Sequence, residues 1–455
     1  MNPEFLPFDL PVCDARQHAL VHASVLTMAD ERVLADHTVV VEAGRIRTIG
    51  PSYDIDTAGM QVFDCRSRFV MPGLADMYTH YWDPADSPLY LAAGVTTVRT
   101  VCVPFQLALS KLAERGEFPS PRMVTLSPPI DGVNAQGRTD MPRGVAMTDA
   151  SQAQALIRRF VASGYDQIKG FSLLAPDNLR ALCSAARDAG IRVTTNCPNA
   201  MRFEDAIEAG VHCLDQLHNV ARGHLRAGAP EPPFWDRFDP VPGTRLDFDA
   251  IQRLGGLLAE RDVWNVPTLV FHQRDGLPPA EGMRDPDLRY VSAQSIEDWD
   301  ATLGRWTKRA AMTDADAWRA AARERARAFI EVVRMFASEG APLLTGTDSL
   351  NPWNVPGRSL HTELANFVTA GMRTFEALQC ATTAAARFLG ESGESGETPA
   401  LRCCALVRSA CRRSRSNVVS ARSTASAARS GWPPGRRTVD GRERRGSAKR
   451  PFWWE

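Results

Sequence analysis

The stretch "MPGLADMYTHYWD" (Met71–Asp83) opens the part of the chain that decides the fold. It starts with a short apolar run and places Tyr78 and His80 two residues apart. Residues i and i+2 of a strand point to the same face, so these two side chains share one side. A neutral histidine is a good nitrogen ligand for zinc, manganese or iron. His80 is therefore the first candidate metal ligand, with a tyrosine beside it.

Short apolar strands alternate with amphipathic helical runs from Met71 onward. Eight β–α units over about 300 residues favour an α/β fold of the (β/α)8 TIM-barrel type across residues 71–390. A doubly wound open sheet also fits the alternation, but it gives no reason to stop at eight units. The predicted strands are 73–80, 96–103, 122–129, 166–172, 192–196, 212–218, 263–271 and 342–348.

The segment before the barrel, residues 1–70, contains short runs rich in Val, Ile and Thr that are broken by Gly and Asp turns. This pattern is typical of strands, and we expect it to form part of a small β-sandwich. The chain starts without a basic and apolar leader pattern, so we expect no signal peptide. No apolar run reaches the roughly eighteen residues of a membrane helix, so we expect no membrane partner.

The overall composition gives few clues about partners. The formal net charge is zero, so it provides no global argument for binding nucleic acid or membranes. The ten cysteines include no CxxC pair, and we expect reduced thiols in a cytoplasmic protein. We expect a small-molecule substrate as the partner, and the composition leaves homo-oligomer formation open.

Candidate ligands fall at the predicted carboxyl ends of several barrel strands, where TIM barrels build their active sites. They are His80, Lys169, Asn196, His218 and Asp348. The Asp348 carboxylate could bind a metal and also take a proton from metal-bound water. A free ammonium repels a cation, so Lys169 would serve only if it were made anionic, for instance as a carbamate.

Two further histidines follow predicted strands six and seven. His224 and His272 could face the pocket, and we take them as candidate substrate contacts. A packing role is the alternative for both.

The chain resembles the amidohydrolase superfamily, in particular its imidazolonepropionase-like and Xaa-Pro dipeptidase-like group. The motifs that carry the resemblance run from about residue 19 to residue 390. They are "PGLADMYTH", "LAAGVTTVRT", "IKG", "AGVHCLDQLH", "VPTLV", "LLTGTDS" and "LHTELANFVTAGMRTFEALQCATTAAARFLG".

The resemblance implies a hydrolase in which a metal-activated hydroxide attacks an amide or cyclic C–N bond. It implies that Asp348 is the general base and that His80, Lys169, His218 and Asp348 bind one or two zinc-class cations. His218 would have a catalytic role as well, and Lys169 would be the carbamylated bridging ligand.

Two positions depart from the pattern of this family. Tyr78 replaces the first strand-one histidine, and Asn196 stands where a strand-five histidine belongs. A tyrosine ligand must lose a proton whose reference pKa is about 10, and an asparagine offers only a neutral oxygen. We therefore expect weak metal binding and slow or absent hydrolysis. The alternative function is a catalytically impaired homologue that binds a small molecule without turnover.

The last segment, residues 391–455, is rich in Arg and Ser where the family would complete the sandwich with further strands. Three readings stay open: a nucleic-acid-binding tail, a natural disordered tail, or a shift of the reading frame near residue 396. The last two leave the C-terminal strands missing or replaced, which would expose strand edges of the N-terminal part.

Overall fold

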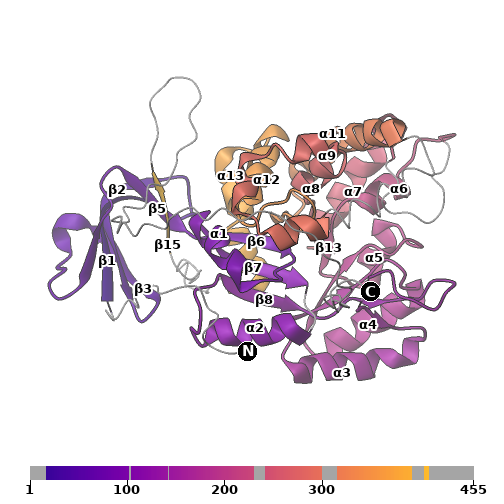
Figure 1. The fold of residues 1–455 in the computed structure, drawn as a ribbon, viewed down its shortest axis with the longest axis horizontal. Coiled ribbons are helices and arrows are strands. Elements are labelled where there is room, and N and C mark those ends of the chain that lie inside the picture. The colour runs from indigo at the N-terminus through magenta and orange to yellow at the C-terminus, as the bar shows by residue number, and fades with distance from the viewer. Residues whose placement is uncertain are drawn as a thin grey trace, which may run out of the picture. The chain divides into compact units, whose positions relative to one another are not determined.

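The computed structural model describes residues 17–101, 104–141, 143–229, 241–299, 315–391 and 404–408 (Figure 1). The predictions about the leader, about most of the 391–455 tail and about its reading frame lie outside these residues.

Seven parallel strands form one sheet that is nearly closed into a barrel, so the predicted fold class is confirmed. Strand β6 is buried at every position, as expected for a parallel strand covered on both faces. In sheet order the strands are β14 (Trp264–Val266), β13 (Cys213–Asp215), β12 (Arg192–Asn196), β11 (Gln167–Gly170), β8 (Arg122–Leu126), β7 (Val95–Val101) and β6 (Leu74–Thr79).

The predicted eighth strand, 342–348, closes the gap between β14 and β6 as an extended segment rather than as a regular strand. Leu344 N donates to Asn265 O on one side, and Met77 N donates to Thr345 O on the other, at 3.0 and 2.8 Å. Gly346 permits this passage, since a Cβ there would meet Tyr78 Cβ at 2.9 Å. We call residues 342–349 the closing segment.

One buried carboxylate ties the closing segment to β6. Asp76 accepts a hydrogen bond from Thr347 N at 3.0 Å and another from Thr347 Oγ1 at 2.6 Å. Both residues are fully buried. Because Asp348 directly follows Thr347, this contact also helps to fix the position of the Asp348 backbone.

Helices follow most strands and cover the barrel (Figure 1). Two of the predicted helical runs end at glycines as expected, because Gly164 and Gly190 have the positive φ of a helix stop. The helices are α1 (Ser87–Ala92), α2 (Pro104–Glu114), α3 (Ala153–Ser163), α4 (Pro176–Asp188), α5 (Phe203–Ala209), α6 (His218–Gly223), α7 (Phe248–Glu260), α8 (Leu269–Asp275), α9 (Pro279–Gly282), α11 (Ala315–Ser338), α12 (Arg358–Thr369), α13 (Thr374–Cys380) and α14 (Thr383–Leu389).

Two predicted strands are shorter than expected. The segment 263–271 is a strand only over β14, because Thr268 has φ of 49° and α8 starts directly after it. The segment 212–218 is a strand only over β13, because Gln216 has φ of 66° and turns the chain.

The N-terminal part forms a single six-stranded sheet. Strand β1 pairs with β4 along its first half and with β5 along its second, and it has register shifts between Leu20 and Val25. Its apolar core includes Ala23, Val39 and Val70. The strands are β1 (Gln17–Leu26), β2 (Val33–Glu42), β3 (Arg45–Pro51), β4 (Gln61–Asp64), β5 (Arg68–Pro72) and β15 (Cys404–Arg408).

We expected the C-terminal strands to be missing or replaced, and residues 404–408 supply one strand to the sheet. Strand β15 pairs antiparallel with β5, with Leu406 opposite Val70. The short apolar run "CALVR" supplies the pairing, although the surrounding residues are rich in Arg and Ser. The edge of β5 is therefore covered along these residues.

Among the described residues, none of the helices combines the length and the apolar composition that crossing a bilayer requires.

The first prediction concerns the Asp76–Thr347 contact. Thr347→Val removes a buried hydroxyl donor and should lower the free energy of unfolding by about 1–3 kcal/mol, measured by urea denaturation. Thr369→Val is the control, because its hydroxyl lies on the exposed side of α12 and should matter by less than about 0.5 kcal/mol. Equal effects of both variants would contradict a tie through Thr347.

The second prediction concerns pH. Burial raises the pKa of Asp76 to about 7, against the opposing hydrogen bonds from Thr347. The folded state therefore keeps this proton to higher pH than the unfolded chain, whose reference pKa is about 3.9. The free energy of unfolding should fall as pH rises from about 4 to 7, relative to Asp76→Asn, which resembles the protonated acid. A pH-independent difference between the two proteins would show that Asp76 does not titrate in this range.

Candidate active site

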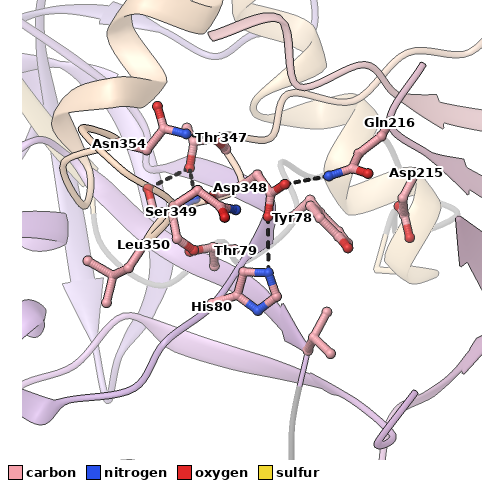
Figure 2. Close-up of polar contacts among 12 residues, drawn as sticks. Tyr78, Thr79, His80, Asp215, Gln216, Thr347, Asp348, Ser349, Leu350 and Asn354 are labelled. Carbon is pink, nitrogen blue, oxygen red and sulfur yellow. Dashed lines mark hydrogen bonds and ion pairs between the residues drawn. The ribbon is translucent and has the colours of Figure 1, made fainter. Parts of the chain in front are cut away.

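The carboxyl ends of the barrel strands bring four of the predicted residues into one set of contacts. Tyr78 and His80 lie at the end of β6, and Asp348 lies in the closing segment (Figure 2). Asn196 ends β12. We call this place the barrel mouth. All but His80 are buried, and the His80 side chain is 15% exposed.

Three hydrogen bonds run across the mouth from strand to strand. Tyr78 Oη donates to Asn196 Oδ1 at 3.2 Å, and Asn196 Nδ2 donates to Gln216 Oε1 at 2.6 Å. Gln216 Nε2 in turn donates to Asp348 Oδ2. We call this series, from Tyr78 through Asn196 and Gln216 to Asp348, the polar chain.

His80 lies at the end of the polar chain. Its Nε2 lies 3.0 Å from Asp348 Oδ1, which is an ion-pair distance when the imidazole is protonated (Figure 2). The imidazole ring stacks on Trp82 at an interplanar angle of 9°. The His80 ring is therefore in contact with Asp348 on one side and with Trp82 on the other.

Gln216 is the site residue that sequence reasoning missed. We expected His218 to end strand six, but β13 ends at Asp215 and His218 is the first residue of α6. Asn196 pairs with Asp215 in register, so the residue that follows Asp215 lies level with the mouth. Matching the ends of strands five and six would have pointed to Gln216.

Three non-glycine residues near the carboxyl ends of the last barrel strands have left-handed backbone conformations. The φ angles are 66° at Gln216, 49° at Thr268 and 56° at Asp348. Such conformations cost about 1–3 kcal/mol each and concentrate at functional sites. Here two of the three place side chains of the polar chain.

Lys169 belongs to a different set of contacts, deeper in the barrel. Its Nζ donates to Asp215 Oδ2 at 2.5 Å, and Arg99 Nη2 donates to Asp215 Oδ1 at 2.6 Å. The side chains of all three are fully buried. The Nζ atom also lies 4.6 Å from the centre of the Tyr78 ring.

Charge pairing governs this triad. Burial alone would raise the pKa of Asp215, but Lys169 and Arg99 outweigh it and hold the pKa below its usual range. Burial lowers the pKa of Lys169, and Asp215 opposes that shift. Asp215 is thus a carboxylate shared by two basic side chains.

The residues of the mouth do not fit the metal centre that the resemblance implies. A carbamate on Lys169 would place a second anion against the Asp215 carboxylate, and an ammonium there repels a cation. Tyr78, Asn196 and Gln216 are engaged with one another, so His80 and Asp348 are left as two ligands. Zinc sites in proteins use three or four protein ligands.

The two candidate substrate contacts, His224 and His272, are packed against residues other than those of the polar chain. His224 is buried, and its ring nitrogens contact Val220 O at 3.0 Å and Glu204 Oε1 at 2.9 Å. Both nitrogens are engaged, so the prediction of a substrate contact at His224 is not supported by its geometry. His272 is fully buried in α8, where its ring lies 4.5 Å from that of His218.

A cavity of about 10 Å³ lies beside the polar chain. Such a volume holds about one water molecule. It is lined by Ser172, Asn196, Cys197, Phe203, Asp215, Gln216, His218 and Asn219.

Several solved structures that are similar to this chain have the names of hydrolases. They include bottromycin amidohydrolase, with 23% identity, a TM-score of 0.61, and coverage of 84% of this chain and 79% of that chain. A Xaa-Pro dipeptidase with methionine bound in its active site has 17% identity and a TM-score of 0.57, covering 82% and 89%. The A. niger ochratoxinase has 15% identity and a TM-score of 0.57, covering 82% and 85%.

These similarities show a shared fold, so the expected TIM barrel with an N-terminal β domain is confirmed. No protein-family model and no curated protein matches the sequence.

The third prediction tests the charge pairing in the barrel. Asp215→Asn leaves Arg99 and Lys169 without their shared carboxylate and should lower the free energy of unfolding by about 3–5 kcal/mol in urea denaturation. Asp64→Asn is the control, since it breaks an exposed pair with Arg66 and should cost less than about 1 kcal/mol. A small effect at Asp215 would mean that Lys169 is not held as a charged partner.

Proposed function

We propose that this chain is a hydrolase that cleaves an amide bond of a small molecule at the barrel mouth, with His80 and Asp348 as its acid–base pair. The observation that carries the proposal is the 3.0 Å contact between His80 Nε2 and Asp348 Oδ1 at the strand ends. The names of the similar structures, an amidohydrolase, a dipeptidase and ochratoxinase, support the reaction class.

The geometry assigns different tasks to the two residues. Asp348 accepts from Gln216 through Oδ2 and faces His80 through Oδ1, so its role is to orient the imidazole. The other ring nitrogen, His80 Nδ1, is assigned the role of the base. It can take a proton from a water that attacks the amide carbon and then return it to the leaving amine.

Asn196 and Gln216 are positioning residues in this proposal. They hold the Asp348 carboxylate toward His80 through the polar chain, and they do not touch the reacting atoms. Tyr78 anchors the far end of the polar chain through its hydroxyl.

No metal-dependent step is part of the proposal, because the mouth does not fit a cation. Acid–base catalysis by a positioned side chain contributes about 10²–10⁴-fold. Without a Lewis acid to polarise the carbonyl, this contribution limits the rate, so we expect slow turnover.

A second candidate function is binding of a small molecule without turnover. The observation in its favour is the polar chain itself. It uses the side chains of Tyr78, Asn196 and Gln216 for one another, so these groups are not available to stabilise a transition state.

The fourth prediction separates the two candidates. Wild-type protein is incubated with dipeptides ending in proline and with N-acyl amino acids, and the released amine is measured by liquid chromatography. We expect slow hydrolysis that Asp348→Asn and His80→Asn each reduce at least about 10²-fold. His37→Asn is the control, since that histidine lies on β2 of the N-terminal sheet.

Each outcome decides the question. Turnover that persists in Asp348→Asn would overturn the acid–base assignment. Ligand binding by calorimetry with no turnover would support the second candidate, and an absence of both would reject both functions for these compound classes.

A further inference from the structure

A second group of ligand-type side chains lies outside the acid–base pair and outside the barrel triad. His218 starts α6, and His272 and Asp275 lie three residues apart on α8, so that they share one face of that helix. All three are buried, and their ligand atoms lie within 4.8 Å of one another. The rings of His218 and His272 meet edge to face, at 67°.

Polar atoms inside this group lack hydrogen-bond partners. Neither ring nitrogen of His272, which is 0% exposed, is hydrogen-bonded to another described residue. The same holds for Asp275 Oδ1 within the described part of the chain. Buried polar atoms nearly always have hydrogen-bond partners in native proteins, so these atoms are candidates for binding a ligand.

The surroundings keep the donors in the forms that bind metals. The rings of Phe271 and Phe329 pack against His272, and burial, with Arg325 nearby, holds its pKa well below the usual range. The imidazole is thus neutral and has a free lone pair. Burial raises the pKa of Asp275 to about 6, against the pull of Arg325, so it is ionised above that pH.

Arg325 occupies only one side of the carboxylate. Arg325 donates a hydrogen bond to Asp275 Oδ2. The other carboxylate oxygen, Oδ1, accepts none from the described residues. Carboxylates that bind metals are commonly held in this way by an outer hydrogen bond. The guanidinium charge lowers the affinity for a cation, but it fixes the orientation of the ligand.

We propose that His218, His272 and Asp275 form a binding site for a divalent cation of the zinc class, separate from the barrel mouth. Two imidazoles and one carboxylate make a ligand set that suits zinc, cobalt or iron. Metal–ligand bonds of about 2.1 Å keep ligand atoms within about 4.2 Å of one another, so the side chains contract slightly on binding. The cation joins the start of α6 to α8, the two helices that follow β13 and β14.

The site does not depend on the proposed hydrolysis, and metal titration tests it directly. The full chain, freed of metal by a chelator, is titrated with Co²⁺, whose visible absorption reports nitrogen and oxygen ligation. We expect about one Co²⁺ per chain, displaced by Zn²⁺, and a rise in melting temperature on Zn²⁺ binding.

Variants locate the cation. His272→Asn should abolish the Co²⁺ absorption, and Asp275→Asn should weaken binding at least about tenfold. His80→Asn removes a mouth residue and should leave the titration unchanged. Circular dichroism checks that each variant is folded, and Asp275→Asn decides the matter if His272→Asn is not.

Two results would overturn the proposal. One is a wild-type protein that binds no Co²⁺ or Zn²⁺. The other is binding that survives His272→Asn and Asp275→Asn but is lost in His80→Asn, which would place the cation at the mouth.

Discussion

The hydrogen bonds from Thr347 to Asp76 are the contacts on which the barrel mouth depends. The closing segment exchanges backbone hydrogen bonds with both neighbours, but among the described residues its only strand pairings are single bridges at Leu343 and Ser349. A buried carboxylate that receives both a backbone and a hydroxyl donor fixes the segment where the ladder is weak. Asp348, one residue further, donates its own backbone N–H to Tyr78 O at 2.8 Å, so both contacts hold it beside His80.

A second constraint is charge balance inside the barrel. Arg99 and Lys169 come from different strands, and a buried cation is costly unless it is paired. Asp215 forms ion pairs with both. Lys169, the residue that would have to carry a carbamate, is therefore already engaged inside the barrel. Lys169 can thus stabilise the fold without binding a metal.

Much of the fold follows from local rules, and the sequence predicts it for that reason. Strand alternation predicted the barrel, and Gly164 and Gly190 end helices as their positive φ requires. At the mouth, Tyr78, His80, Asn196 and Asp348 were found because strand ends converge. Gln216 was missed because its backbone turn shortens β13, and an amide does not stand out among ligand types. Arg99 and Asp215 were missed because their pairing links distant strands, which no local pattern reveals.

The polar chain shows what occupies the barrel mouth at Tyr78 and Asn196, the two positions where the resemblance implied histidines. A histidine lost from a metal site leaves a buried space that must be filled by a group with satisfied donors and acceptors. Tyr78, Asn196 and Gln216 satisfy one another in turn and end on Asp348, so the three side chains depend on one another. A histidine at position 78 alone would break one hydrogen bond of the polar chain, and a histidine at position 196 alone would break two, without completing a ligand set. A change at any one of the three positions therefore alters the hydrogen bonding of at least one of the others.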